Sequence, residues 1–215
     1  MRKIVSALGL TAPARGVETR IRALLASTRG VAAVEFAMIL PFLLLIYCGL
    51  AEVTFGVNID RKLTLLSRSL GDLTARATTV DSTEIKNIFG AASAVAAPYS
   101  TAAVQMRISS VAVIANGSQV QGKVCWSEGR GGLAALTTGS GYTVPAGFQT
   151  ANTTFIVAEV KMPYQPVFGY ALTGAFMLNE TTPWPVRNVS EVAYAGVKTF
   201  KDNEQGRSAT GKCLS

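Results

Sequence analysis

The sequence of 215 residues contains no histidine. Histidine is the usual protein ligand for metals and the usual general base near neutral pH, so its absence argues against a metal site and a Ser-His-Asp arrangement. The glycine-rich stretches 129–132 and 139–141 are also not followed by the lysine and then serine or threonine that end a phosphate-binding loop. We therefore expect no enzyme activity, no cofactor and no metal site.

Charge is scarce and unevenly placed. Charged residues make up 15% of the chain, and the formal net charge is +7. Residues 1–30 hold six basic residues and one acid, so this short end carries +5, and the rest of the chain carries only +2. A nucleic-acid-binding domain gathers positive charge on a folded face, so this distribution argues against a nucleic-acid partner.

Cysteine is also rare, with Cys48 in an apolar run and Cys125 and Cys213 further along. If the C-terminal part of the chain is exported, a disulfide between Cys125 and Cys213 is the natural pairing. It would close a loop of roughly 90 residues and stabilise the fold by a few kcal/mol in the chain-entropy model. Two free buried thiols are the alternative.

Residues 31–57 form a long apolar segment whose only charges are Glu35 and Glu52. As a helix it reaches about 40 Å, more than the roughly 30 Å of a bilayer core, so we predict a single transmembrane span. A buried helix of a soluble protein is the alternative, but such helices are rarely apolar on every face. The basic residues before the span predict a cytoplasmic N-terminus and an exported C-terminal part. Pro41 predicts a bend near residues 37–41.

Two further helical patterns follow the span. Leucines recur at near-helical spacing and predict that the span continues as a stem to about Ala75. Asp81-Ser-Thr-Glu84 is typical of a capping box, and it predicts a second helix that runs to about Ala97 before Pro98 stops it. The stem leucines are Leu63, Leu65, Leu66, Leu70 and Leu73.

The remaining sequence has the strand and turn patterns of a β-sheet. Asn116-Gly117 is a hairpin-turn signal, and residues 129–145 are expected to form a loop. We predict that residues 76–215 form one α+β domain, helix first and then an antiparallel sheet. The expected strands cover 104–114, 120–126 and 153–162, and a last strand is expected within 184–195.

A spacing at the start of the span carries the functional hypothesis. Gly30 is followed by four small or apolar residues and then by Glu35-Phe36. This resembles the cleavage site of a type IV prepilin, where a membrane-embedded prepilin peptidase cuts after the glycine. The resemblance implies that Val31 becomes the mature N-terminus, and that Glu35 and Phe36 serve in peptidase recognition and assembly.

Glu35 also has a physical argument of its own. A carboxylate near a bilayer interface costs about 2 kcal/mol or less, and a paired cation reduces this cost. A free ammonium at Val31 would be such a cation, within one chain or between staggered chains. The alternative is that Glu35 extends to the cytoplasmic headgroups. Glu52, at the opposite interface, is expected to be a solvated charge.

Residues 30–44 resemble the start of TadE-like proteins, the pseudopilins of tight-adherence (Flp) pilus systems, including the proline six residues after the glutamate. Residues 124–127 and 159–166 are similar to the family's downstream pattern. The resemblance implies an inner-membrane protein with a periplasmic domain, whose partners are the prepilin peptidase, other pilins or pseudopilins and pilus assembly proteins. A mature chain of 185 residues favours a minor or accessory pseudopilin over the main filament subunit.

Two alternatives stay open. The first is an uncleaved signal-anchored periplasmic domain that recruits a partner through its sheet. The second is a membrane-tethered hydrolase, which needs a pocket that the sequence does not show.

Aromatic residues interleaved with prolines form either a binding surface or ordinary sheet packing, and packing is the favoured interpretation. These aromatic residues are Tyr164, Phe168, Tyr170 and Trp184.

Overall fold

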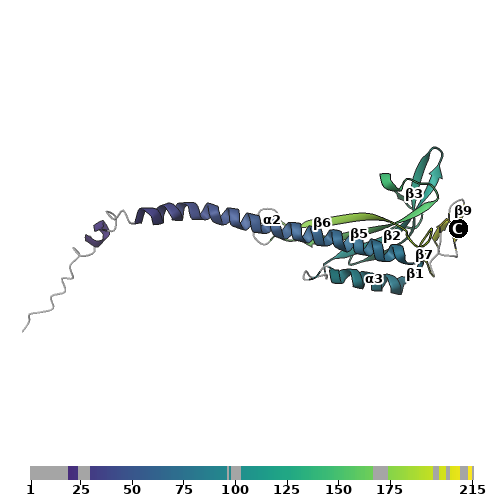
Figure 1. The fold of residues 1–215 in the computed structure, drawn as a ribbon, viewed down its shortest axis with the longest axis horizontal. Coiled ribbons are helices and arrows are strands. Elements are labelled where there is room, and N and C mark those ends of the chain that lie inside the picture. The colour runs from purple at the N-terminus through teal and green to yellow at the C-terminus, as the bar shows by residue number, and fades with distance from the viewer. Residues whose placement is uncertain are drawn as a thin grey trace, which may run out of the picture. The chain divides into compact units, whose positions relative to one another are not determined.

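The computed structural model describes residues 19–23, 30–95, 97, 103–166, 174–195, 199–201, 204–208 and 213–214. The chain divides into two compact units, Met1–Leu50 and Ala51–Ser215. Helix α2, Val31–Arg76, contributes residues to both units (Figure 1). The C-terminal unit therefore begins inside this helix rather than after it.

Helix α2 confirms the expected long helix that continues as a stem. It has 46 residues and runs through Pro41 without interruption, and the bend expected there stays a prediction. From Ile59 onward its buried residues recur every three or four positions, so one face of the stem packs against the domain. These residues are Ile59, Leu63, Leu66, Ser67, Leu70, Gly71, Thr74 and Ala75.

Helix α3, Ser82–Val95, begins where the capping signal places it. The Asp81 carboxylate accepts hydrogen bonds from the backbone N–H groups of Thr83 and Glu84 at 2.8 and 2.7 Å, which satisfies two free donors of the first turn. The helix ends at Val95, two residues earlier than expected. The Lys62 ammonium donates to the Val95 carbonyl at 3.3 Å and links the stem to the end of α3.

The main sheet has five antiparallel strands in the order β4-β3-β2-β5-β6. Strands β2 and β3 form a hairpin whose two-residue turn begins at Gly117, and the φ of +63° there is one that glycine adopts without steric cost. The strands are β2 Gln105–Asn116, β3 Gln119–Arg130, β4 Gly141–Tyr142, β5 Thr153–Tyr164 and β6 Phe176–Pro185. With the two helices, the sheet confirms the α+β class.

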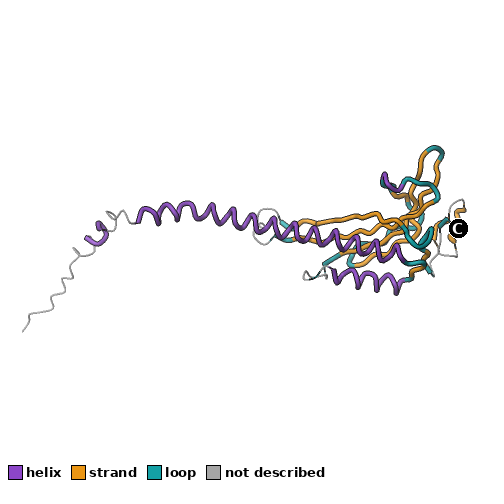
Figure 2. Tube along the Cα trace, viewed as in Figure 1, coloured by secondary structure: helices purple, strands orange, loops and turns teal. Residues whose placement is uncertain are grey.

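Several short elements complete the fold (Figure 2). A parallel two-residue pair joins β1, Thr79–Val80, to β7, Ala193–Tyr194. A second hairpin joins β8 and β9, and a short 3-10 helix, η2, lies between β4 and β5. Their bounds are β8 Thr199–Lys201, β9 Glu204–Ser208 and η2 Ala146–Phe148.

The sequence predicts a last strand within 184–195, and the structure confirms this only in part. The fifth strand of the sheet, β6, ends at Pro185, and in the rest of that range the structure has the two-residue strand β7. Prolines at 183 and 185 discourage a strand assignment because they cannot donate to a ladder. Strand β6 accommodates them because it is an edge strand, paired only with β5. The loop expected over 129–145 also begins with the end of β3 and contains β4.

A bulge in β3 aims two consecutive side chains into the same core. The pairing with β2 shifts from Ser110 opposite Trp126 to Val111 opposite Val124, so Cys125 has no partner in the ladder. An extra residue of this kind re-aims the side chains beside it. Cys125 and Trp126 accordingly both lie in the main hydrophobic cluster.

Each face of the sheet has its own hydrophobic cluster. The main cluster joins the stem of α2 and helix α3 to one face, through residues such as Leu66, Ile85, Met106 and Ile156. The smaller cluster on the other face is covered by the β4 and η2 region, and it contains Val111, Val113, Phe155, Val157, Tyr142, Val144 and Phe148. The alternation of these residues along β5 is the period-two pattern of a strand buried on both faces.

The stem approaches the sheet closely at Gly71. A Cβ built on Gly71 would lie 3.1 Å from Cβ of Trp184 in β6, which is tighter than an ordinary van der Waals contact, so a side chain there would have to shift Trp184. Nearby, the Ser67 hydroxyl donates to the Ala158 carbonyl of β5 at 3.0 Å. The stem is thus fixed to β5 and β6 by close packing and by a buried hydrogen bond.

Replacing Gly71 by leucine is expected to lower the free energy of unfolding of the full-length protein in detergent by about 1–3 kcal/mol, because the new side chain must displace the Trp184 indole. Gly90→Ala in α3 is the matched control. A Cβ there meets no atom within 4 Å, so the usual helix preference for alanine predicts a gain of about 0.5–1 kcal/mol. Denaturant unfolding followed by tryptophan fluorescence measures both. A stabilising Gly71→Leu would contradict the close packing.

Candidate functional site

Gly30 and Val31 lie where helix α2 begins. Gly30 is exposed, and a Cβ built on it meets no atom within 4 Å. Val31 is the first residue of α2 and is 52% exposed. The side-chain positions on either side of this peptide bond are therefore both open in the described structure.

Glu35 and Phe36 lie one turn further along the helix. Both are exposed, Phe36 at 58%. Glu35 follows Val31 by four residues, so the two side chains lie on the same face of the helix, about one turn apart. No acidic residue lies in the first turn itself. Glu35 is thus the first carboxylate of α2 and lies close to the positive end of the helix dipole.

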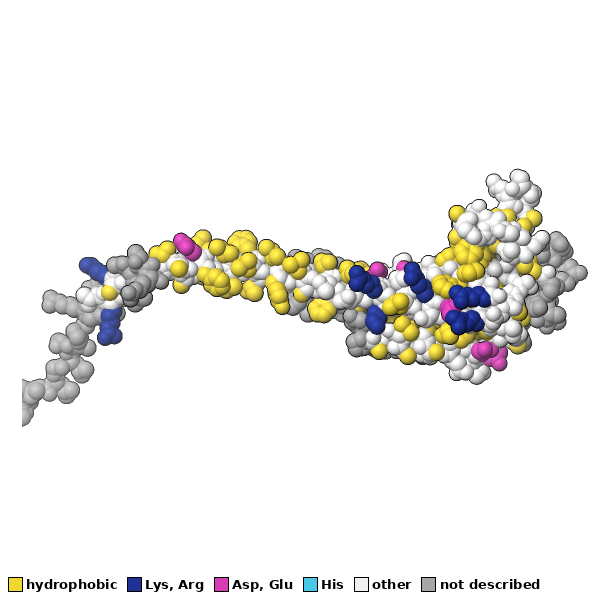
Figure 3. All heavy atoms as spheres, viewed as in Figure 1, with side chains coloured by type: hydrophobic (Ala, Val, Ile, Leu, Met, Phe, Trp, Pro, Cys, Tyr) yellow, Lys and Arg dark blue, Asp and Glu magenta, His cyan; other side chains and the backbone are white. Residues whose placement is uncertain are grey.

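The N-terminal half of α2 exposes an apolar surface. Its most apolar 18-residue window has a mean hydropathy of 2.3 and no buried residue. Figure 3 shows hydrophobic side chains over the visible face of this half of the helix. The described part of the protein therefore does not cover these apolar side chains. By length and composition the helix is a candidate single membrane span. The exposed residues include Phe36, Met38, Ile39, Phe42, Leu45, Ile46, Tyr47, Leu50 and Val53.

The environment of Glu52 differs from the sequence-based expectation, which was a solvated charge. The Tyr164 hydroxyl donates to a Glu52 carboxylate oxygen at 2.5 Å, and Glu52 is half-buried. Tyr164 itself is buried, at the end of β5, with Phe176 of β6 edge-on at 5.3 Å between ring centroids. Long-range folding brings this strand end to the helix, which spacing along the sequence does not show.

The aromatic residues singled out in the sequence divide into two groups. Tyr164 and Trp184 take part in packing, as favoured, since both belong to the main cluster or pack against it. Phe168 and Tyr170 lie outside the described residues. The described part of the set is therefore not an exposed binding surface.

Cys125 and Cys213 are joined by a disulfide, with their Cα atoms 5.8 Å apart. The buried Glu191 carboxylate lies beside this bond and accepts hydrogen bonds from the backbone N–H groups of Cys213 and Leu214, the latter at 3.0 Å. Cys125, Glu191 and Cys213 have the spacing of a three-ligand metal site. Because the two sulfur atoms are bonded to each other, neither is a thiolate that could bind a metal. The disulfide and the Glu191 hydrogen bonds instead attach residues 213–214 to the domain.

Residues 30–68 match the model of the TadE-like protein family. The suspected family is thus confirmed over this segment. The match begins at Gly30, covers the exposed apolar half of α2 and ends in the stem, at Arg68. No curated protein and no solved structure shows a significant match to the chain.

Several side-chain hydrogen bonds outside the TadE-like segment were missed by sequence reasoning, and they involve residues 191–194. Besides the Glu191 contacts, the Trp126 indole N–H donates to the Val192 carbonyl at 2.9 Å, and the Tyr194 hydroxyl donates to Glu128 at 2.6 Å. Burial and the Glu128 carboxylate raise the pKa of Tyr194. Trp126 lies in residues 124–127, which resemble the downstream pattern of TadE-like proteins, but that resemblance does not indicate its partner. Glu128, Glu191 and Tyr194 stand in no recognisable spacing.

Cys213→Ser is expected to lower the free energy of unfolding by about 4–5 kcal/mol, the chain-entropy value for a loop of 88 residues. Glu191→Gln is expected to cost about 1–2 kcal/mol, because two buried N–H donors lose their charged acceptor. Asp60→Asn, at an exposed position of the stem, is the control and should change stability by less than about 0.5 kcal/mol. Denaturant midpoints of the oxidised full-length protein measure all three. A denaturant midpoint of Cys213→Ser equal to that of the native protein would contradict the stabilising role of the disulfide.

Proposed function

We propose that this protein is a minor or accessory pseudopilin of a tight-adherence (Flp) pilus assembly system, with a structural role and no enzymatic one. A prepilin peptidase removes residues 1–30, and the mature chain begins at Val31. The observation that carries the proposal is the start of α2 at Val31, directly after an exposed glycine, in a segment that matches TadE-like proteins.

The charge of the leader supports an orientation for the processing step. Residues 1–30 carry a net charge of +5, and basic residues beside a span are retained on the cytoplasmic side. On this proposal the protein is a single-pass inner-membrane protein with its C-terminal domain in the periplasm. The disulfide between Cys125 and Cys213 supports an oxidising compartment for that domain.

Cleavage would give Glu35 a partner. It creates an ammonium group at Val31, one helical turn from the Glu35 carboxylate, and a paired cation reduces the cost of a carboxylate at the membrane edge. Between staggered chains the same pair would fix the register in which apolar helices pack. Other pilins or pseudopilins are therefore the partners for the exposed apolar half of α2 in the assembly.

The processing step is tested by co-expressing the full-length protein with and without a prepilin peptidase and sequencing the mature N-terminus. We expect a start at Val31 that depends on the peptidase, and no cleavage of Gly30→Leu, because the added side chain occupies space that the glycine leaves open. Gly49→Leu is the control, since Gly49 lies in the same helix and has equally open surroundings. Intact residues 1–30 in the membrane-bound native protein would instead support the uncleaved signal-anchored binding domain.

The assembly step is tested by Glu35→Ala and Glu35→Gln, each introduced into the full-length protein in the producing cell. We expect both to lower the yield of sheared pili at least tenfold, because neither side chain can pair with an ammonium at Val31. The fraction that begins at Val31, measured separately, tells a defect in peptidase recognition from one in helix packing. Asp60→Asn, which removes an exposed carboxylate further along the helix, should leave the yield unchanged. Normal pilus yield from both Glu35 variants would rule out the proposed assembly role of this residue.

A further inference from the structure

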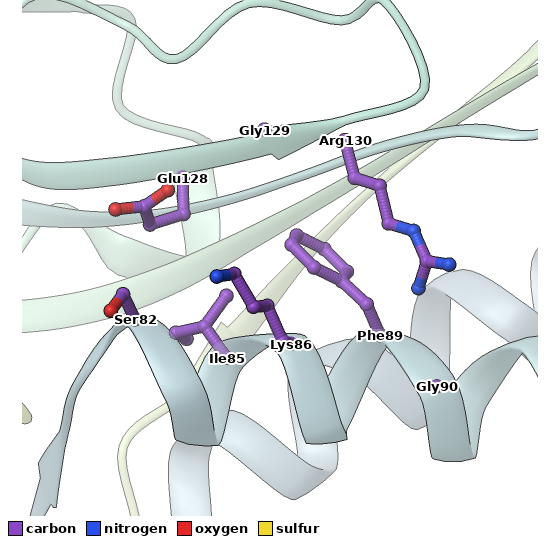
Figure 4. A pocket seen from close by; sticks show the side chains of 8 residues that line it. All are labelled: Ser82, Ile85, Lys86, Phe89, Gly90, Glu128, Gly129 and Arg130. Atoms are coloured by element: carbon purple, nitrogen blue, oxygen red, sulfur yellow. The ribbon is translucent and has the colours of Figure 1, made fainter.

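A groove of about 560 Å³ lies between helix α3 and the end of strand β3. In Figure 4 the helix supplies one wall with Ile85, Lys86 and Phe89, and the strand supplies the other with Glu128 and Arg130. Binding sites for small ligands and peptide side chains have volumes of this order, and they combine an apolar lining with a few polar groups. This groove belongs wholly to the C-terminal unit and is separate from the candidate cleavage segment.

The floor of the groove is apolar and rigidly held. Ile85 and Phe89 are 1% and 2% exposed and belong to the main hydrophobic cluster. They project from one face of α3 at a spacing of four residues, so the floor follows the helix axis. Because the domain already covers almost all of both side chains, the floor offers a ligand only a small apolar contact.

The rim of the groove is basic. Lys86 and Arg130 are both exposed, and Figure 4 shows the Phe89 ring between their charged ends. Neither side chain has a hydrogen bond or an ion pair with any residue that the structure describes. The acid of the groove, Glu128, already accepts a hydrogen bond from the Tyr194 hydroxyl. The rim is therefore left with two cations from opposite walls and one engaged carboxylate, so charge complementarity favours an anionic ligand.

We propose that this groove binds a segment of a partner protein in which an apolar side chain is flanked by acidic residues. The apolar side chain rests on Ile85 and Phe89, and the acidic side chains pair with Lys86 and Arg130 from either side of it. The site goes beyond the proposed pilus role and does not depend on cleavage after Gly30.

Gly90 provides a variant that closes the groove without disturbing the fold. It lies in α3 at the side of the groove, and a Cβ built on it meets no atom within 4 Å. Gly90→Leu therefore adds a side chain to the open space. Because leucine has a higher helix propensity than glycine, the substitution is not expected to destabilise α3. Ala91→Leu is the matched control, because Ala91 is the next residue of α3, is exposed and does not line the groove.

The experiment screens the detergent-solubilised full-length protein against two libraries of twelve-residue peptides. One library has a fixed centre of glutamate, a varied apolar residue and glutamate, and the other has lysine in place of both glutamates. We expect enrichment from the glutamate library alone. The best peptide should bind at least tenfold more weakly to Gly90→Leu and to the double variant Lys86→Gln, Arg130→Gln. Its affinity should not change for Ala91→Leu or for Lys123→Gln, which removes a cation of β3 outside the groove. Unfolding midpoints of all variants confirm that they are folded.

Three outcomes would overturn the proposal. The first is the absence of enrichment from the glutamate library over the lysine library. The second is peptide binding that survives Gly90→Leu, because the peptide would then occupy another surface. The third is binding to vesicles of anionic phospholipid that Gly90→Leu abolishes while no peptide binds, because the groove would then receive a lipid rather than a protein.

Discussion

A single unbroken helix has to satisfy two different surroundings, and the rest of the structure depends on where its sequence changes from one to the other. Up to Val57 the apolar side chains of α2 are exposed around the helix, and only an apolar medium or other apolar helices can cover them. From Ile59 the buried residues of the helix recur on one face, which packs against the rest of the domain, including β5 and β6. The contact between Glu52 and Tyr164 lies before this change, so the domain already contacts the helix within the apolar run.

The elements that could be predicted from the sequence are those whose cause is local. The start of α3 follows from the Asp81 carboxylate and two N–H groups next to it in the chain. The β2–β3 hairpin follows from a glycine at the one turn position with a positive φ. The apolar run of α2 can be predicted as a membrane span without knowledge of its contacts, because length and composition alone indicate such a span. Segment 30–36 belongs to the same class, since its residues are near neighbours in the sequence.

The features that could not be predicted depend on pairing between distant segments. Prolines 183 and 185 argue against a strand unless the sheet edge is known, and the edge is defined only by the whole strand order. Glu52 and Glu191 resemble ordinary acidic residues until Tyr164 and the backbone of Cys213 are brought beside them. Even the Cys125–Cys213 pairing, the natural one from cysteine counting, needed the bulge in β3 to aim Cys125 into the core.

Packing within the domain explains the glycine at position 71 but not the glycine at position 90. A glycine inside a helix costs about 0.5–1 kcal/mol relative to alanine, so each position calls for a physical reason. At Gly71 the reason is the Trp184 side chain, which a Cβ would contact at 3.1 Å, closer than ordinary van der Waals contact. At Gly90 no atom of the described structure comes within 4 Å of the place where a Cβ would lie, so packing within the domain supplies no reason. The physical effect of the glycine there is to leave the side of the α3 groove open, next to an apolar floor and two cations without partners among the described residues. An open groove is useful only if something enters it, and this is the argument for a ligand that the domain does not itself provide.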